Sequence, residues 1–201
     1  MGELPTSEIE GTARALRILR AGDAPEAREM LARRAAQLAL RTASALTSSR
    51  DLADEVSQDV AVEVLRSIHK LRDENAFDAW VHRITVRRAK KVVLNRSNRR
   101  RRELPLALQT REPENHSPEI AELVSLRAAL GVALADLPDR QLLAIALRYI
   151  HDLSDEDIAA ALGAKVGTVH ALLSRARSAL RNSDELALFA PTKEATDVGP
   201  V

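Results

Sequence analysis

The segment LSDEDIAAALGAKVGTVHALLSRARSAL, residues 153–180, decides the fold because it describes two short helices joined by a tight turn. Ser154 is a favourable N-cap for the first of these helices, and Asp157, three residues later, gives a weak capping-box pattern. Gly163 then supplies a residue that tolerates the left-handed backbone conformation found in tight turns between helices. The segment therefore predicts a short helix, a turn at Gly163 and a longer helix.

The apolar residues of this segment have the spacing of a helix-turn-helix. Ala159 is small where two helices would cross, Gly163 follows four residues later, and Val169 follows six residues after that. We predict that Ile158, Leu162 and Val169 form the core of the motif.

The second helix of the motif predicts one apolar side and one polar, basic side. The apolar stripe consists of Val169, Leu173, Ala176 and Leu180, and Leu172 lies beside it, so we expect Leu172 to pack. The candidates for DNA contacts are Lys165, Thr168, His170, Ser174, Arg175, Arg177 and Arg181. Among them Arg175 suits a bidentate contact to guanine, whereas Thr168 at the helix start suits a phosphate. The alternative is an ordinary helical hairpin with a solvated basic face. Agreement of cap, turn, spacing and one-sided charge favours DNA binding.

Outside this motif the sequence also favours helices throughout. The chain has 201 residues, only 7 Gly and 8 Pro, and 2% aromatic residues. The periodicity predicts helices at 14–20, from Pro25 to about residue 47, from near Asp51, from Phe77 to near Arg102, and again after Pro118. We therefore expect an all-α protein of two small helical domains, a four-helix domain at 14–102 and a helix-turn-helix domain at 119–182. A linker at 103–118 would join them, with tails at 1–13 and 183–201.

The helix that begins near Asp51 has one clear apolar face. Val56, Val60, Val64 and Ile68 recur at four-residue intervals, and Ala53, Ala61 and Leu65 widen the stripe. Its acidic residues, Asp51, Asp54, Glu55, Asp59 and Glu63, lie mostly away from that face. This pattern predicts a helix with one side in the core and an acidic side that is open to a partner.

Basic residues gather in the next helix. The net charge is only +1, but acidic and basic residues lie in separate segments, so the charge distribution is bipolar. Ten Lys or Arg and no acid occur between Ala79 and Arg102: 83, 87, 88, 90, 91, 96 and 99–102. Arg83, Arg87 and Lys90 share one helical face, which suits a phosphate backbone; the alternative is a solvated basic face. Arg88 falls on the apolar arc, so that arc ends there or the aliphatic stem of Arg88 is buried.

Composition excludes several classes of protein. There is no Cys, which removes disulfides, thiolate catalysis and Cys-based zinc sites, and no apolar run reaches the roughly 18 residues of a membrane span. The first residues are acidic rather than basic, which is not typical of a secretory signal, so we expect a cytoplasmic protein.

The sequence also lacks the usual patterns of a catalytic or metal site. The five His residues are dispersed and no phosphate-binding glycine loop occurs. We therefore expect no enzymatic activity, no cofactor and no metal, and expect each His on the surface or at a cap. Asp54, Glu55 and Asp59 resemble a metal site, but their helical spacing splays them and favours a partner-binding face.

Two ordered sets of motifs together resemble the extracytoplasmic-function sigma factors of the sigma-70 family. ADEVSQDV (53–60) and AWVHRI (79–84) look like the acidic signature and the Trp-containing fourth helix of that family's promoter-melting domain, and AGD (21–23) matches its first turn. LP (137–138), LSDEDIA (153–159), LG (162–163), GTV (167–169) and SRAR (174–177) resemble its upstream-element-binding domain. The resemblance spans 14–181, with a linker in the expected place.

The resemblance implies a role for each region. Such a protein is an alternative sigma factor that binds core RNA polymerase and directs transcription initiation through the −10 and −35 promoter elements. Its polymerase contacts would be the β′ coiled coil and the β flap. The β′ contact would fall on Asp54, Glu55, Gln58 and Asp59, and a flipped −10 base would be captured by Arg72, Asp73, Glu74 and Asn75. The helix that begins near Val166 would bind the −35 element. An anti-sigma factor is a further candidate partner.

The chain departs from the family's pattern at several positions. Arg87 and Lys91 stand where the family has Asn and Asp, an aromatic residue is missing near Val92, and His170 and Leu172 replace frequent Lys or Arg. These changes favour phosphate contacts over base contacts in the first domain. The alternative function is that of a helix-turn-helix regulator, or of a decoy for an anti-sigma factor, that does not itself initiate transcription.

Overall fold

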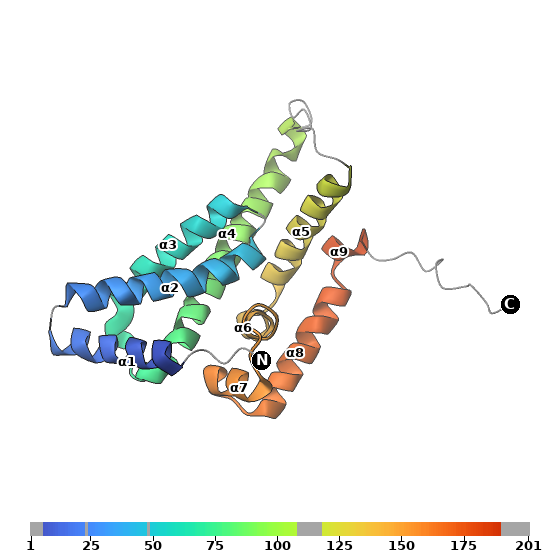
Figure 1. Ribbon diagram of the computed structural model, residues 1–201. Helices are drawn as coiled ribbons and strands as arrows, with labels where there is room; N and C mark the ends of the chain where they lie inside the picture. Colours follow the sequence, from blue (N-terminus) through green and yellow to red (C-terminus); the bar gives the residue numbers. More distant parts are fainter. Residues whose placement is uncertain (1–5, 23, 48, 108–117, 190–201) are drawn as a thin grey trace.

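The computed structural model describes residues 6–22, 24–47, 49–107 and 118–189, and the elements in this part of the chain are helices (Figure 1). The first group comprises α1 (Thr6–Ala21), α2 (Pro25–Leu46), α3 (Arg50–Ser67), the 3-10 turns η1 (Ile68–Lys70) and η2 (Glu74–Ala76), and α4 (Phe77–Ala107). The second comprises α5 (Pro118–Asp136), α6 (Asp139–Tyr149), α7 (Asp155–Leu162), α8 (Val166–Arg181) and the short α9 (Asp184–Ala187). The expected all-α class with two helical groups is confirmed.

Small residues on α2 make it the centre of the first domain. Its buried side includes Ala35, Ala39 and Ala43, which are fully buried, so that α3 and α4 can pack closely against it. Pro25 lies in the first turn of α2, as the sequence predicts. On α3 the predicted stripe is confirmed, since Ala53, Val56, Val60 and Val64 are fully buried and Ile68 is packed against the core; Ala61 and Leu65 are half-buried.

Three helical segments differ from the sequence prediction in their extent. α1 begins at Thr6 rather than near residue 14, and α4 continues to Ala107, five residues beyond the expected end. The five added residues of α4 are Glu, Leu, Pro, Leu and Ala; Glu, Leu and Ala are strong helix formers, and Pro105 is confined to the last turn. α9 lies within the segment expected to be a tail.

The second domain is built around α6, which is buried on almost every side. Leu142, Ala144, Ala146 and Leu147 are at most 1% exposed, because α6 is covered by α4, α7 and α8. In Figure 1 α6 is seen end-on between α4 and α8. This placement makes α6 part of both the second domain's core and the junction between domains.

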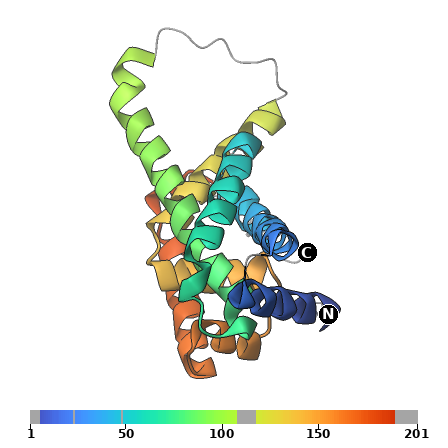
Figure 2. The same ribbon diagram turned by 90° about the vertical axis from the view of Figure 1, so that its left-hand side faces the viewer.

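The two domains pack directly on one another. α5 runs beside α4 and contacts it through its C-terminal half, where residues 133–135 are buried, whereas 119–127 are exposed (Figure 2). Gly131 permits this approach, because a Cβ there would lie 2.8 Å from the carbonyl oxygen of Leu46 at the end of α2. Arg127 Nη2 donates to Ser44 O at 2.8 Å, and Arg41 Nη2 donates to Ile150 O at 3.0 Å. The junction is therefore a packed interface with its own hydrogen bonds.

Across the described ranges, no helix combines the length and apolar character that a membrane-spanning helix needs.

Candidate nucleic-acid and protein interfaces

The turn of the helix-turn-helix has the geometry that its sequence predicts. Ser154 Oγ accepts a hydrogen bond from Asp157 N at 3.1 Å, so Ser154 caps α7, and it donates to Asp157 Oδ2 at 2.6 Å, which orients the capping hydroxyl. Gly163 has φ 57° and ψ 46°, the left-handed conformation, and its N–H bonds to carbonyls at the end of α7. The predicted core is confirmed: Ile158 and Val169 are fully buried and Leu162 is 9% exposed.

This turn presents one side of α8 to solvent. Val169, Leu173 and Ala176 face the core, and Leu172 is half-buried against it, which confirms that Leu172 packs. All seven predicted DNA-contact residues are exposed: Lys165, Thr168, His170, Ser174, Arg175, Arg177 and Arg181. Four of these side chains are cationic: Lys165, Arg175, Arg177 and Arg181. Such a surface suits contacts to DNA phosphates, with the polar side chains near the base edges.

His170 differs from its neighbours because it has a partner within the domain. Its Nε2 lies 3.0 Å from Asp155 Oδ2, and the other oxygen of Asp155 accepts a hydrogen bond from Arg148, which also donates to Leu153 O. Partial desolvation raises the pKa of Asp155, but the hydrogen bond from His170 and the charge of Arg148 outweigh it, so this pKa lies below its usual range. These contacts tie the start of α7 to α6 and α8.

The basic face of α4 is only partly open. Arg83 and Arg87 are exposed, but Lys90 Nζ donates to Leu137 O at 2.6 Å and to Asp139 Oδ1 at 3.2 Å, in the second domain. The sequence places these three residues on one face. The structure shows that Lys90, the third of them, binds residues of the second domain at the junction.

The acidic face of α3 is likewise divided. Glu55 and Gln58 are exposed, whereas Asp59 accepts hydrogen bonds from Arg88 of α4. That hydrogen bond raises the pKa of Arg88. The apolar arc of α4 therefore includes Arg88, whose side chain is half-buried and whose guanidinium binds Asp59.

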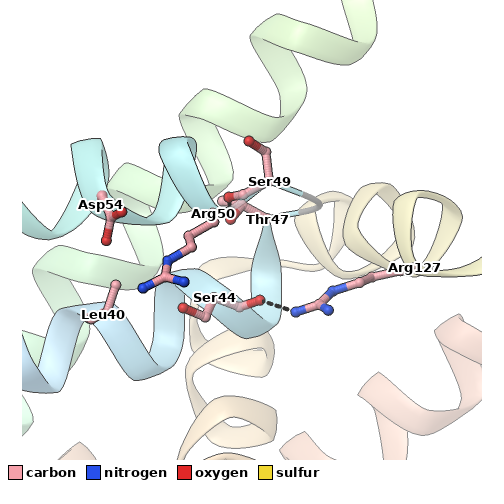
Figure 3. A pocket seen from close by; sticks show the side chains of 7 residues that line it. All are labelled: Leu40, Ser44, Thr47, Ser49, Arg50, Asp54 and Arg127. Carbon is pink, nitrogen blue, oxygen red and sulfur yellow. Dashed lines mark hydrogen bonds between the residues drawn. The ribbon is translucent and has the colours of Figure 1, made fainter. Parts of the chain in front are cut away.

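Asp54 lies at the edge of a hollow of about 390 Å³ between α2, α3 and α5 (Figure 3). Leu40, Ser44, Thr47, Ser49, Arg50 and Arg127 line the rest of it. Among the residues described, no three His, Asp or Glu side chains gather closely enough to hold a metal ion, so Asp54, Glu55 and Asp59 do not form such a group.

The loop from Leu71 to Ala76, here the 71–76 loop, is held by α1. Arg17 and Arg20 each donate to one carboxylate oxygen of Glu74, at 2.9 and 3.0 Å. Asp73 Oδ1 accepts a hydrogen bond from Asn75 N at 3.0 Å and so caps η2. Of the four predicted base-capture residues, Arg72, Asp73 and Asn75 are exposed, while Glu74 is half-buried under the two arginines.

Two histidines contradict the expectation that each His lies on the surface or at a cap. His82 is 5% exposed, its ring centroid lies 3.9 Å from that of His151, and Nδ1 of His82 is buried without a hydrogen-bond partner. His151 Nε2 lies 2.8 Å from Thr42 Oγ1. The pair joins α4 of the first domain to the loop before α7.

Burial lowers the pKa of His82 to about 4, with further lowering by the charges of Arg34 and Arg41. Burial also lowers the pKa of His151 to about 3, helped by His82 and Arg41. One signal was present in the sequence: His82, Thr85, Val86 and Ala89 form a second stripe at helical spacing, and all four are buried.

Comparison with known proteins gives two family matches in chain order. Residues 31–101 match the family described as Sigma-70 region 2, and residues 127–180 match Sigma-70, region 4. The described geometry agrees with this order, since the first range covers most of α2 to α4 and the second contains the helix-turn-helix.

Several curated proteins are similar over both regions. The chain is 33% identical over 153 residues to the ECF RNA polymerase sigma factor SigE of Mycolicibacterium smegmatis, covering 76% of this chain and 59% of that protein. It is 33% identical over 145 residues to the ECF RNA polymerase sigma-E factor of Haemophilus influenzae, covering 67% of this chain and 75% of that protein. For the ECF RNA polymerase sigma-E factor of Escherichia coli (strain K12), the identity is 30% over 136 residues, covering 64% and 71%.

A solved structure shares the fold. The structure of CnrH in complex with the cytosolic domain of CnrY aligns over 92% of this chain and 99% of that chain, with a TM-score of 0.53 and 21% sequence identity.

Proposed function

Because this chain belongs to the extracytoplasmic-function sigma factors of the sigma-70 family, we propose that it binds core RNA polymerase and directs transcription initiation at promoters with −10 and −35 elements. The observation that carries this function is the capped helix-turn-helix with an exposed basic side, which follows an acidic and then a basic helix in the first domain. The two matched ranges, 31–101 and 127–180, lie within the proposed domains at 14–102 and 119–182.

We assign the polymerase contact in the first domain to the acidic side of α3. Glu55 and Gln58 are exposed there, and Asp54 and Asp59 flank them. An acidic helix face favours a basic partner surface, for which we propose the β′ coiled coil, and the second domain would bind the β flap. Sigma factors are initiation factors rather than enzymes, and we assign no catalytic step to any residue of this chain.

We assign the promoter contacts to three surfaces. The 71–76 loop would capture a flipped −10 base, Arg83 and Arg87 would contact phosphates, and the exposed side of α8 would bind the −35 element. Lys90 joins the phosphate contacts only after it leaves Leu137 and Asp139. We therefore expect the contact between Lys90 and the second domain to open when Lys90 binds a phosphate. A protein with these partners would work in the cytoplasm.

Run-off transcription with purified core polymerase and genomic fragments tests the proposal. A sigma factor gives discrete transcripts that depend on the added chain, and their start sites share upstream elements. A helix-turn-helix regulator would bind DNA but not core polymerase. A decoy for an anti-sigma factor would give no chain-dependent transcript with core enzyme and any fragment. Either result would refute the proposed function.

A further inference from the structure

A pair of arginines on α1 holds the 71–76 loop from more than fifty residues away in the sequence. Arg17 Nη1 lies 2.9 Å from Glu74 Oε2, and Arg20 Nη1 lies 3.0 Å from Glu74 Oε1. Arg20 also reaches the backbone, because its Nη2 donates to Leu71 O at 2.5 Å and lies 3.5 Å from Arg72 O. We call Arg17, Arg20 and Glu74 the arginine clamp.

The clamp is poorly placed to stabilise the fold. The side chains of Arg17 and Arg20 are 63% and 43% exposed, and ion pairs at such positions contribute little to stability because water and salt screen them. The geometry is nevertheless specific: both oxygens of one carboxylate are used, and one guanidinium joins that carboxylate to the loop backbone. A fixed loop shape is therefore the main physical consequence of these contacts.

The clamp also divides the loop's side chains into two groups. Glu74 is only 19% exposed and each of its oxygens already accepts a hydrogen bond from an arginine, so a base edge reaches it less easily than its exposed neighbours. Arg72, Asp73 and Asn75 remain exposed beside it. The loop thus has an anchor and three outward polar side chains.

We propose that Arg17 and Arg20 are positioning residues for −10 recognition: they hold the 71–76 loop through Glu74 in the shape that captures the flipped base. This inference rests on the proposed function. Base selection then belongs to Arg72, Asp73 and Asn75, and Glu74 acts as the anchor. The physical reason is preorganisation: a loop held in one shape fits the preferred base, whereas a loop that can change shape also adapts to the other bases.

The test uses the full-length chain with core polymerase and a promoter library randomised at the −10 element. Arg20→Ala and Glu74→Gln should each reduce the discrimination between the preferred base and the other three by about tenfold, the size expected when one loop residue regains its backbone freedom and the loop can adapt to the other bases. The double variant should lose little more than either single variant, because both changes break the same clamp. Discrimination at the −35 element and affinity for core polymerase should not change.

Two controls separate positioning from other roles. Arg33→Ala removes an exposed ion pair to Glu29 on α2, far from the loop in the chain, and should leave the −10 profile unaltered. Arg20→Lys keeps the charge but loses the fork that reaches both Glu74 and Leu71, so it should recover only part of the discrimination.

Three results would overturn the inference. If Glu74→Gln changed the preferred base while Arg20→Ala did not, Glu74 would read the base itself. If both variants lowered transcription equally for all four bases, the clamp would not act in base selection, and a lower melting temperature would mark it as purely structural. An unaltered −10 profile in both variants would also refute it. Failure of the wild-type chain to bind core polymerase or to initiate would instead refute the proposed function, so the two failures can be told apart.

Discussion

At the scale of single residues, His82 and His151 couple the domain junction to pH. Both rings are held neutral, since burial lowers the pKa of His82 to about 4 and that of His151 to about 3. In the unfolded chain a His binds a proton near pH 6.5. Below that pH the unfolded state binds a proton that the folded state does not, so stability falls as pH decreases from 6.5 and levels off below the folded pKa.

We expect His82→Phe to flatten this pH dependence. A flat ring beside His151 would be kept, while the buried Nδ1 without a partner is removed. The difference in free energy of unfolding between the variant and wild type should therefore move by about 3 kcal/mol in favour of the variant between pH 7 and pH 4. This is the size expected from lowering the pKa of His82 from 6.5 to about 4. Urea unfolding between pH 4 and 7 measures it. His69→Gln, at an exposed position, is the control, and parallel curves for His82→Phe and wild type would contradict the assignment.

Arg175 and Arg181 should behave differently on DNA although both are exposed on α8. Arg175→Ala should weaken binding selectively at one or two −35 positions, by about 1 to 3 kcal/mol for a lost bidentate contact to guanine. Arg181→Ala should weaken all sequences alike and flatten the slope of log affinity against log salt by about one unit. Titrations against a randomised −35 element at several salt concentrations separate these effects. An unaltered preference in the Arg175 variant would show that α8 reads shape or phosphates there.

At the scale of elements, the turn between α7 and α8 depends on one glycine. A Cβ at Gly163 would meet no atom within 4 Å, so substitution there costs only the left-handed backbone, φ 57°. Gly163→Ala should therefore lower the free energy of unfolding by about 1 kcal/mol. Gly167→Ala, four residues later inside α8 and also in open space, should raise it by about 0.5 kcal/mol. Thermal unfolding of both variants measures this, and equal effects would contradict the turn geometry.

The acidic side of α3 can be tested without disturbing the core. Asp59 is unsuitable because its substitution would also release Arg88. Glu55→Lys with Gln58→Lys should instead weaken core-polymerase binding by about tenfold or more, since two cations would face a basic partner. Glu26→Lys with Gln37→Lys makes the same charge change at exposed positions on α2 and should bind normally. Undiminished binding of the α3 variant would remove α3 from the interface.

At the scale of the whole molecule, the packed junction sets a condition for activity. Lys90, Arg127 and Arg41 all use hydrogen bonds to hold the two domains together, and Lys90 is one of the proposed phosphate contacts. We therefore expect the domains to separate when the chain engages a promoter. The bipolar charge of the first domain supports this, because its basic helix is attracted to DNA more strongly than to the single carboxylate of Asp139.

A covalent lock across the junction tests this expectation. The chain has no Cys, so Ser44→Cys and Arg127→Cys provide a unique pair, at positions joined by a hydrogen bond of 2.8 Å. A bismaleimide about as long as the lost arginine side chain should abolish transcription from promoters that need both elements. Each single variant treated with the same reagent, and a Glu29→Cys, Arg33→Cys pair cross-linked within α2, should stay active. Full activity of the locked chain would show that the closed arrangement is competent.

The sequence alone determined the features that repeat at helical spacing. The stripe of Val56, Val60 and Val64, the cap at Ser154 and the left-handed Gly163 all depend on residues within four positions of one another, so local hydrogen bonds and side-chain periodicity are enough to predict them. The two ordered motif sets indicated the family for the same reason, because each motif is local in the chain.

Only the tertiary structure decided which of these faces meet. Glu74 pairs with Arg17 across 57 positions, Lys90 reaches Leu137 across 47, and His151 reaches Thr42 across 109. Helical periodicity places a side chain on a face, but it carries no information about which other face covers it. The contacts that position the 71–76 loop, occupy Lys90 and bury His82 arise because packing the apolar stripes brings distant polar residues within hydrogen-bond distance.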